Sequence, residues 1–215
     1  MFLNKKSLAM DNLYEAVYKG NFIAAKAAVA EALNSGMEPQ AIIDSSMCPA
    51  MEAIGKDFEE GRAFVPNLLL SAKAMKVALD ILKPLMNSGQ KAIIGTVVIG
   101  TVKGDLHDIG KNLVASMLEG TGFNVINLGA DVSKERFIAA AKEHNAQIIC
   151  LSALLTTTMD YMQEVVEAVR ADGLDVKIMV GGAPLNAEFA AKIGADGYSS
   201  NANEATVLAK RLIAS

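Results

Sequence analysis

The sequence predicts an α/β protein in which an N-terminal four-helix bundle is followed by a flavodoxin-like (Rossmann-type), doubly wound sheet of five parallel strands. Residues 8–87 have the apolar spacing of helices and almost no strand pattern. From Lys91 onward, short apolar runs alternate with helical stretches. Between the two parts, Ser88, Gly89 and Gln90 form a turn-prone linker. We therefore expect a helical cap domain at residues 1–89 and a sheet domain at residues 90–215.

In the first part, we expect helices wherever apolar residues recur at helical spacing between turn-forming residues. Gly20 and the run at residues 34–36 provide stops. Pro49 lies inside the third periodic stretch and predicts a kink or break near Ser46, because proline cannot donate a backbone hydrogen bond. The expected helices span residues 8–19, 22–33, 39–54 and 66–82, and their tight connections favour a small antiparallel bundle.

The connection before the fourth helix, residues 58–66, allows two interpretations. Phe64 can be tucked into the bundle as part of an ordinary loop, or Phe64 and the apolar start of the helix can face outward as a lid. Helical periodicity alone favours the tucked side chain.

In the second part, each apolar run that predicts a strand is followed by a helical stretch. This alternation predicts right-handed crossovers, and the short helices suit the strand order 2-1-3-4-5. The expected strands span residues 92–100, 124–128, 147–151 and 177–180, with a short one near Gly197; the expected helices span residues 109–119, 134–143, 157–171, 186–192 and 202–213.

The composition excludes several classes of protein. The 215 residues are 52% hydrophobic and carry a net charge of −4 with no long basic run, which argues against a nucleic-acid partner. The longest apolar runs are about ten residues, short of the ~20 that a membrane-spanning helix needs. The N-terminus does not resemble a signal peptide, and two cysteines do not make a disulfide framework. We therefore expect a cytoplasmic protein without a membrane partner.

The loops that follow the strands should meet at one edge of the sheet, where open α/β sheets bind ligands. These loops hold several glycines and a cluster of hydroxyl groups at Ser152, Thr156, Thr157 and Thr158. None of them carries the glycine-rich, lysine-containing cradle of a phosphate site or a Ser or Cys nucleophile elbow. The loops occupy residues 104–110, 129–131, 152–158, 181–184 and 199–201.

Asp105 and His107 form the chemically distinctive pair of this edge. Residues two apart in an extended segment point to the same side, so Asp105 can accept a hydrogen bond from one ring nitrogen of His107 and leave the other free. The pair fits three roles about equally well: a metal ligand with its orienting carboxylate, a general base with its orienter, or a structural loop. The base lacks a nucleophile, and His144, the other histidine, is expected to be exposed. A single histidine suffices if a macrocycle brings the metal and its other ligands.

The run Asp105-Leu106-His107-Asp108-Ile109-Gly110 is the Asp-x-His-x-x-Gly motif of cobalamin-binding domains. The spaced Ser152 and Leu154 and the later Gly181-Gly182 are similar to the companion motifs of that family. The N-terminal part, with residues 61–66 before Leu68 and Leu69, resembles the helical cap of methionine synthase and of small corrinoid proteins in methyltransferase systems. The resemblance covers residues 8–215.

The resemblance implies a role for each matching residue. His107 is the expected lower axial ligand to cobalt, held by Asp105, with the hydroxyl of Thr158 completing the relay. Phe64, with Leu68 or Leu69, is expected over the upper face of the corrin and thus acts as a lid, contrary to what periodicity alone favours. The remaining expected contacts are Gly104 and Gly110 beneath the corrin, together with Leu106, Asp108 and Ile109 of the motif, and Ser152, Leu154, Thr156, Gly181 and Gly182 along the slot for the nucleotide tail.

The resemblance also implies a function. A chain too short to hold a substrate barrel as well is expected to carry a methyl group on cobalamin or a related corrinoid, alternating between cob(I)alamin and methyl-cob(III)alamin. The implied partners are a substrate-specific methyltransferase, a second methyltransferase acting on tetrahydrofolate or a thiol, and a reductive activase. The alternatives are a cobalamin-dependent sensor and, less favoured, the small subunit of an adenosylcobalamin mutase. Methanol, methylamines, quaternary amines and methoxylated aromatics all stay open as donors.

Overall fold

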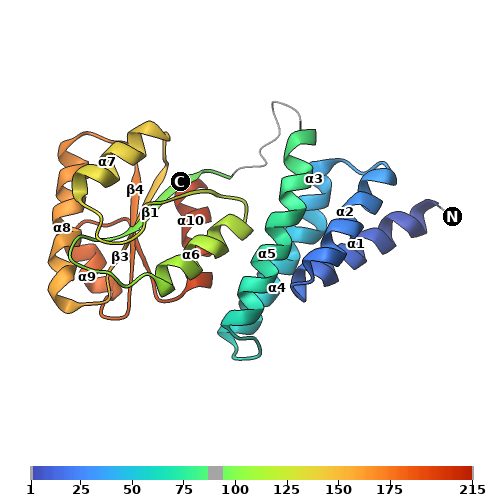
Figure 1. Cartoon of the computed structure of the whole chain (residues 1–215), viewed down its shortest axis with the longest axis horizontal. Coiled ribbons are helices and arrows are strands. Elements are labelled where there is room, and N and C mark those ends of the chain that lie inside the picture. The colour runs from blue at the N-terminus through green and yellow to red at the C-terminus, as the bar shows by residue number, and fades with distance from the viewer. Residues whose placement is uncertain (1, 87–93, 215) are drawn as a thin grey trace. The chain divides into compact units, whose positions relative to one another are not determined.

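The computed structural model describes residues 2–86 and 94–214 of the chain (Figure 1). The chain divides into two compact units, a helical unit in the N-terminal part and an α/β unit that begins at Ile94. The expected linker at residues 88–90, and with it the expected domain boundary between residues 89 and 90, lies outside the described residues. Among the described helices, none is long and apolar enough to cross a membrane.

The helical unit has the four expected helical stretches. The first helix begins earlier than expected, at Phe2, and the second ends at Asn34, with the Asn21 side chain accepting a hydrogen bond from the Ala24 N–H at its start. Helix α1 packs against α2, α4 and α5. The elements are α1 (Phe2–Tyr18), α2 (Phe22–Asn34), α3 (Pro39–Ile42), a π-helical turn (Ile43–Met47), α4 (Cys48–Glu59), α5 (Val65–Leu82) and a 3₁₀ turn (Lys83–Leu85).

The third stretch contains the irregularity that Pro49 predicts. The π-helical turn Ile43–Met47 separates α3 from α4, and the Cys48 N–H bonds the Ile43 carbonyl, five residues back. A proline cannot donate to the turn before it, and the wider turn accommodates the missing bond without ending the helix. The prediction of a break near Ser46 is thus confirmed in this form.

The α/β unit contains the predicted sheet. Its five strands are all parallel and have the order β2-β1-β3-β4-β5, which confirms the flavodoxin-like topology. Strand β1 begins at Thr96, later than expected, and residues 92–93 of the expected strand lie outside the described residues. The elements are β1 (Thr96–Thr101), α6 (Ile109–Gly120), β2 (Asn124–Asn127), α7 (Lys134–Glu143), β3 (Ile148–Ser152), α8 (Thr156–Ala171), β4 (Lys177–Gly181), α9 (Ala187–Lys192), β5 (Gly197–Ser199) and α10 (Ala202–Ala214).

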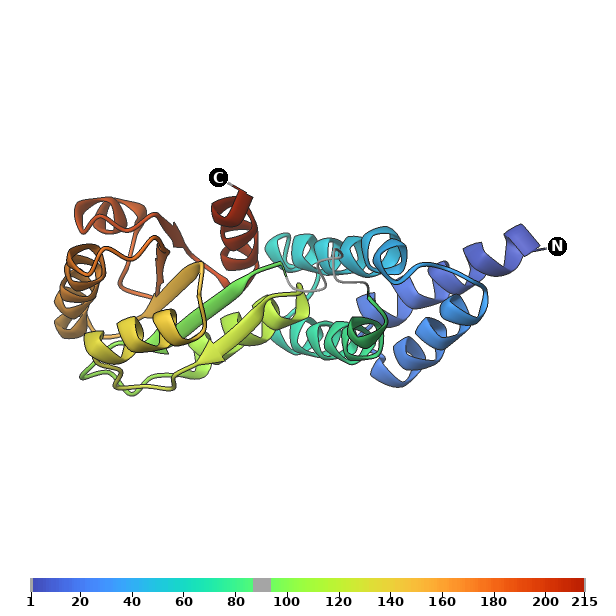
Figure 2. The ribbon, with the colours of Figure 1, turned by 90° about the horizontal axis from the view of Figure 1, so that it is seen from above.

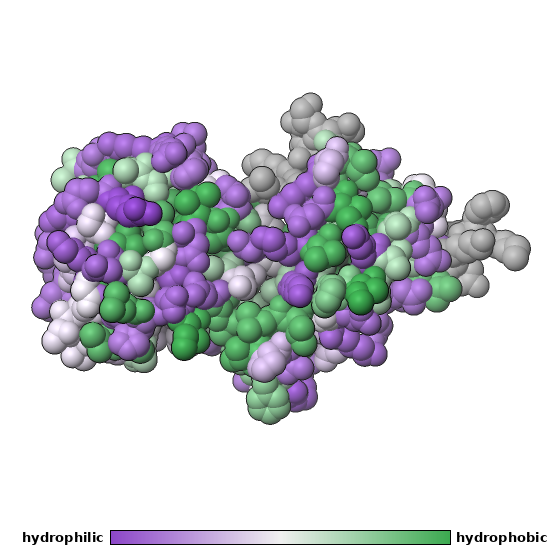
Figure 3. Space-filling model, in the orientation of Figure 1, coloured by the Kyte–Doolittle hydropathy of each residue, from purple (hydrophilic) through white to green (hydrophobic). Residues whose placement is uncertain are grey.

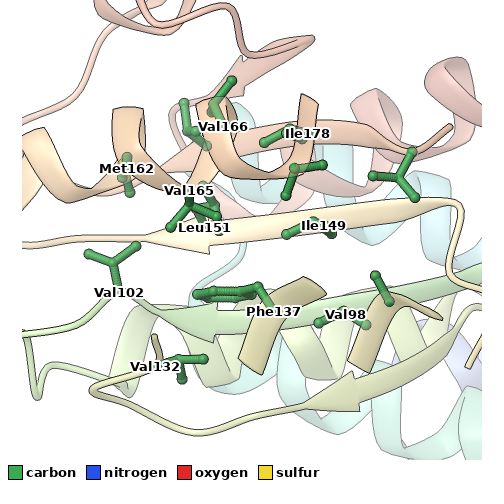
Figure 4. Packing of buried hydrophobic residues seen from close by; sticks show 14 of the residues in the cluster. Val98, Val102, Val132, Phe137, Ile149, Leu151, Met162, Val165, Val166 and Ile178 are labelled. Atoms are coloured by element: carbon green, nitrogen blue, oxygen red, sulfur yellow. The ribbon is translucent and has the colours of Figure 1, made fainter. Parts of the chain in front are cut away.

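Helices cover both faces of the sheet, which explains why its central strands are apolar along their whole length. Helices α7, α8 and α9 cover one face, and α6 and α10 cover the other, as Figures 1 and 2 show. On the first face, Phe137 of α7 lies over the sheet beside Val98 and Val132 (Figure 4). A β-carbon on Gly100 would lie 2.8 Å from the Phe137 ring, so the glycine in β1 makes room for the aromatic side chain.

Candidate functional site

The loops that follow the parallel strands start level with one another. Thr101 at the end of β1 pairs with Ser152 at the end of β3, and Ser152 pairs with Gly181 at the end of β4. The connections run in opposite directions from β1 and from β3, so residues 102–108 and 153–155 flank the topological switch point of the sheet. The motif loop therefore lies where this class of sheet binds ligands.

Asp105 is the polar centre of this edge, and it is completely buried. Its Oδ1 atom accepts hydrogen bonds from the backbone N–H of His107, at 3.0 Å, and from Nδ1 of His107, at 2.7 Å. Its Oδ2 atom accepts from the backbone N–H groups of Leu154, at 2.7 Å, and Leu155, at 3.2 Å, and lies 2.9 Å from the Thr158 hydroxyl. One carboxylate thus joins the loop after β1 to the loop after β3.

These contacts decide the charge of Asp105. Burial opposes its ionisation, but the hydrogen bonds from the backbone of Leu154 and His107 and from the side chains of His107 and Thr158 outweigh burial and hold its pKa well below the ordinary value. The single proton of the Thr158 hydroxyl has a second acceptor, the Leu155 carbonyl at 2.8 Å. Because charged acceptors form the stronger hydrogen bonds, the hydroxyl donates to the ionised Asp105.

The contact with Asp105 sets the tautomer of His107. An ionised carboxylate only accepts, so Nδ1 of the ring carries the proton and Nε2 of the neutral ring has a free lone pair. No hydrogen bond of Nε2 occurs within the described part of the chain. The His107 side chain is 52% exposed, and its carbonyl accepts a hydrogen bond from the buried Thr101 hydroxyl at 2.8 Å. The ring is therefore held from behind and presents Nε2 to a ligand.

Apolar side chains adjoin His107 in the chain and face solvent. Leu106 is 77% exposed and Ile109 is 88% exposed, which is unusual for large aliphatic residues. Gly110 lies in the first turn of α6, and nothing lies within 4 Å of where its β-carbon would be. Asp108 is exposed and accepts a hydrogen bond from the Asn112 side chain at 2.9 Å. The motif thus combines one free imidazole nitrogen with an open apolar surface, which suits a large, mostly apolar ligand.

The other sheet-edge residues lie on the neighbouring loops. Ser152 is half-buried at the end of β3, whereas Leu154 and Thr156 are exposed beyond it. At Gly182, φ is +144° and a β-carbon would lie 1.8 Å from the Ala153 carbonyl oxygen, so no other residue fits there. At Gly181, a β-carbon would lie 3.4 Å from the Ser199 carbonyl oxygen, an ordinary van der Waals contact. Gly182 therefore allows the loops after β3 and β4 to approach closely.

In the helical unit, Phe64 faces outward. It is 67% exposed, so the interpretation that tucks it into the bundle is wrong. Of the two leucines expected beside it, Leu69 is partly exposed, whereas Leu68 is fully buried in the bundle and does not fit a ligand-facing role. Val65 and Leu70 are exposed too, and Figure 3 shows hydrophobic residues gathered over the start of α5.

Three further residues hold the edge together and have no role in the sequence-based prediction. Thr101 binds the His107 carbonyl, and Asp131 accepts a hydrogen bond from the Gly104 N–H at 2.8 Å. Lys111 is buried with its ammonium group 2.7 Å from the Asn127 amide oxygen, and burial lowers its pKa. Their only sequence signal is position: Thr101 ends a strand, Lys111 follows the motif directly, and Asp131 lies in the loop after β2.

The arrangement fits a metal that arrives inside a macrocycle. No cluster of three or more His, Cys, Asp or Glu side chains that could hold an ion occurs among residues 2–86 and 94–214. His107 offers one nitrogen ligand, and an exposed apolar surface suits the rim of a corrin. The residues present therefore fit a corrinoid.

Two models described as the B12 binding domain match the chain, one at residues 95–207 and one at residues 9–83. The chain belongs to the B12-binding family. The prediction of a corrinoid protein, with a helical cap and a Rossmann-like sheet, is therefore confirmed, and cobalamin or a related corrinoid is its cofactor.

Relatives in this family place the chain with methyltransferase systems. It is 43% identical over 190 residues to the dimethylamine corrinoid protein 1 of Methanosarcina acetivorans, covering 87% of this chain and 89% of the relative. It is 44% identical over 179 residues to the trimethylamine corrinoid protein 1 of Methanosarcina mazei, covering 81% and 83%.

Solved structures agree with this placement. A cobalamin-binding protein from Desulfitobacterium hafniense is 32% identical with a TM-score of 0.80, over 94% of this chain and 98% of that one. A chain of the methanol:cobalamin methyltransferase complex of Methanosarcina barkeri is 30% identical with a TM-score of 0.83, over 96% of this chain and 80% of that one.

Proposed function

We propose that this B12-binding protein is a methyl carrier that receives a methyl group on one methyltransferase and delivers it on a second one, which acts on tetrahydrofolate or a thiol. The bound corrinoid supplies a cobalt centre that accepts and releases the methyl group. The observation that carries the proposal is the held histidine: Nδ1 of His107 lies 2.7 Å from the buried Asp105 carboxylate, and Nε2 is free. Among the described sheet-edge loops, none carries a nucleophile elbow or a phosphate cradle that would compete with this interpretation.

His107 is the proposed lower ligand to cobalt, and Asp105 and Thr158 are its proposed support. Hydrogen bonding to a carboxylate fixes the tautomer and orientation of a ligating imidazole and raises its basicity. The Thr158 hydroxyl donates to the same carboxylate and so modulates how strongly Asp105 holds the Nδ1 proton. Together, Asp105 and Thr158 can thereby tune the basicity of His107 Nε2, and with it how strongly this nitrogen would bind the metal.

Phe64 is the proposed shield of the methyl group, together with Leu69. An aromatic residue that is 67% exposed is costly to leave in water, and a partly apolar ligand offers it a partner. Its backbone is well fixed, because the Phe64 N–H donates to the Asn67 side chain at 2.9 Å. A shield of this kind keeps water and oxygen away from a reactive centre.

The class of methyl donor that we propose is a methylated amine. The support is the identity of about 43% to proteins named for dimethylamine and for trimethylamine, each over more than four fifths of this chain. The two amine groups match about equally well, so the degree of methylation is assigned to the partner enzyme. A reductive activase is the third proposed partner.

Reconstitution of the purified protein with hydroxocobalamin tests the ligand assignment. We expect stoichiometric binding with a spectrum in which the cofactor's own base is displaced by histidine, and we expect His107→Ala to abolish this spectrum. His144→Ala is the matched control, because His144 is the exposed C-cap residue of α7. An unchanged spectrum in His107→Ala would refute the assignment.

The carrier function requires a separate test. The reconstituted, reduced protein is incubated with isotopically labelled dimethylamine or trimethylamine and the matching methyltransferase of a Methanosarcina relative. Label that is retained on the corrinoid protein, and that a thiol acceptor then removes with a second methyltransferase, supports the proposal. Absence of label with both amines, alongside normal cobalamin binding, would contradict the amine donor.

A further inference from the structure

Asp131 has an unusual backbone for a residue outside the core. Its φ is +56°, in the left-handed region that non-glycine residues rarely adopt. In the described part of the chain, Asn145 is the only other non-glycine residue with positive φ. Asp131 is exposed, so packing does not explain its conformation. A left-handed residue that persists outside the core calls for an explanation, and its hydrogen bonds provide one.

The side-chain carboxylate and the backbone N–H of Asp131 both form hydrogen bonds with the loop after β1, residues 102–108, which we call the histidine loop. Its carboxylate accepts a hydrogen bond from the Gly104 N–H at 2.8 Å. Its own N–H donates to the Asp105 carbonyl at 3.0 Å. The two hydrogen bonds fix the backbone on either side of the Asp105 α-carbon. The carboxylate that binds His107 is attached at this position. The left-handed conformation lets one residue reach both groups.

Backbone hydrogen bonds around Asp131 hold it in place. Val102 and Val132 form a parallel bridge that extends the pairing of β1 and β2 beyond the strands. The Thr101 N–H bonds the Gly129 carbonyl, and the Val132 N–H bonds the Thr101 carbonyl, both at 3.0 Å. Asp131 lies between Gly129 and Val132, which pair with the end of β1, and Asp131 itself forms hydrogen bonds with the histidine loop instead.

We propose that Asp131 is a positioning residue for His107, acting through the backbone of Gly104 and Asp105. It fixes the direction of the Asp105 carboxylate and thereby the imidazole that this carboxylate orients. The inference rests on the proposed ligand role of His107. Loss of the Asp131 side chain leaves the Asp105–His107 pair in place but less narrowly oriented, so His107 ligates cobalt in a smaller fraction of molecules.

The first test uses the protein without cofactor and three variants. Asp131→Gly removes the carboxylate but keeps the N–H and tolerates positive φ, so the fold should survive. Asp131→Asn keeps an oxygen acceptor in a residue that also tolerates this conformation. Asn145→Gly makes the matched change at the other left-handed position, which lies after α7, away from the motif loop.

Hydrogen exchange of the Gly104 amide, followed by NMR, directly reports the hydrogen bond from this amide to the Asp131 carboxylate. We expect exchange about tenfold faster in Asp131→Gly, because a hydrogen bond to a charged acceptor is lost. We expect exchange near that of the wild type in Asp131→Asn and in Asn145→Gly. Exchange in Asp131→Gly at the rate of the wild type would overturn the inference.

The second test uses the cobalamin-loaded protein labelled with ¹⁵N-histidine. In the wild type, the electron paramagnetic resonance of the Co(II) form should show splitting from a protein nitrogen. We expect that splitting in a severalfold smaller fraction of Asp131→Gly molecules, and its return in Asp131→Asn. Full splitting in Asp131→Gly would overturn the positioning role. Absence of protein-nitrogen splitting in the wild type would instead refute the ligand role of His107.

Discussion

Replacing Asp105 by asparagine should destabilise the α/β unit more than its small change in shape suggests. The carboxylate is buried, and both of its oxygens accept hydrogen bonds only. An asparagine has one oxygen and one NH₂ group, so in either orientation an NH₂ group meets backbone N–H donors. With ~1.5–3 kcal/mol for each hydrogen bond to a charged group and two such bonds lost, we expect a loss of about 3–6 kcal/mol.

The pH dependence of this loss has a defined sign. The pKa of Asp105 is depressed in the folded protein, so its stabilisation is fully present above the unfolded pKa of about 3.9 and is lost as the pH falls through the lower folded value. The stability difference between the wild type and Asp105→Asn should therefore be constant near neutral pH. It should shrink once the pH falls below about 4.

Native-state hydrogen exchange of the core amides of β1 and β3, in protein without cofactor, measures this difference for the α/β unit alone. Asp175→Asn is the control, because Asp175 is exposed in the loop before β4 and should change stability by no more than about 0.5 kcal/mol. A loss below about 1 kcal/mol in Asp105→Asn, or a difference that stays constant on acidification, would refute the reasoning.

Three further variants test other parts of the molecule. Phe64→Ala should speed photolysis or oxidation of the methylated protein with little change in cobalamin affinity, unlike the exposed-site control Leu8→Ala; a collapse of affinity would contradict the shield. Gly110→Ala should stabilise the cofactor-free protein by about 0.5–1 kcal/mol, as expected for a helical glycine with open space beside it, yet weaken cobalamin binding; equal or tighter binding would argue against close packing there. Lys111→Met should leave the free energy of unfolding, measured in urea at neutral pH, within about 1 kcal/mol of the wild type. The reason is that the side-chain oxygens of Asn112 and Asn127 each still accept a hydrogen bond from another donor. A loss above about 2 kcal/mol would show that the cation is needed.

The Lys111 variant has a second readout. Because burial lowers the folded pKa of Lys111, wild-type stability should rise as the pH increases through that value toward the unfolded one, about 10.4. The methionine variant lacks this slope. Urea unfolding at neutral pH and at about pH 9.5 compares the two.

The order of helices and strands could be predicted because the spacing of apolar residues depends only on neighbouring residues and differs between a helix and a strand. Pro49 is an example: a missing N–H disturbs the helix next to it whatever lies elsewhere in the fold. The motif at residues 105–110 could be found for a related reason, since a loop between a buried strand and a helix must lie at the carboxyl edge of a parallel sheet.

The exposure of individual side chains could not be predicted in the same way. Leu68 and Leu69 are adjacent and equally apolar, yet one is buried and the other partly exposed, because their directions differ by the turn of the helix and only the packed bundle decides which faces inward. Phe64 lies in extended backbone just before α5, so helical periodicity does not set its direction, and only the family resemblance led us to expect that it faces outward.

Fold class, strand order and the place of His107 at the sheet edge could all be predicted from the amino-acid sequence, because they follow from local periodicity and from the rules of parallel sheets. Two other features could be seen only in the folded chain. The Asp105 carboxylate accepts a hydrogen bond from Leu154, 49 residues downstream, and Asp131 is hydrogen-bonded to the backbone on either side of the Asp105 α-carbon. Such contacts join residues that are far apart in the chain, and their geometry exists only once the strands have paired in register.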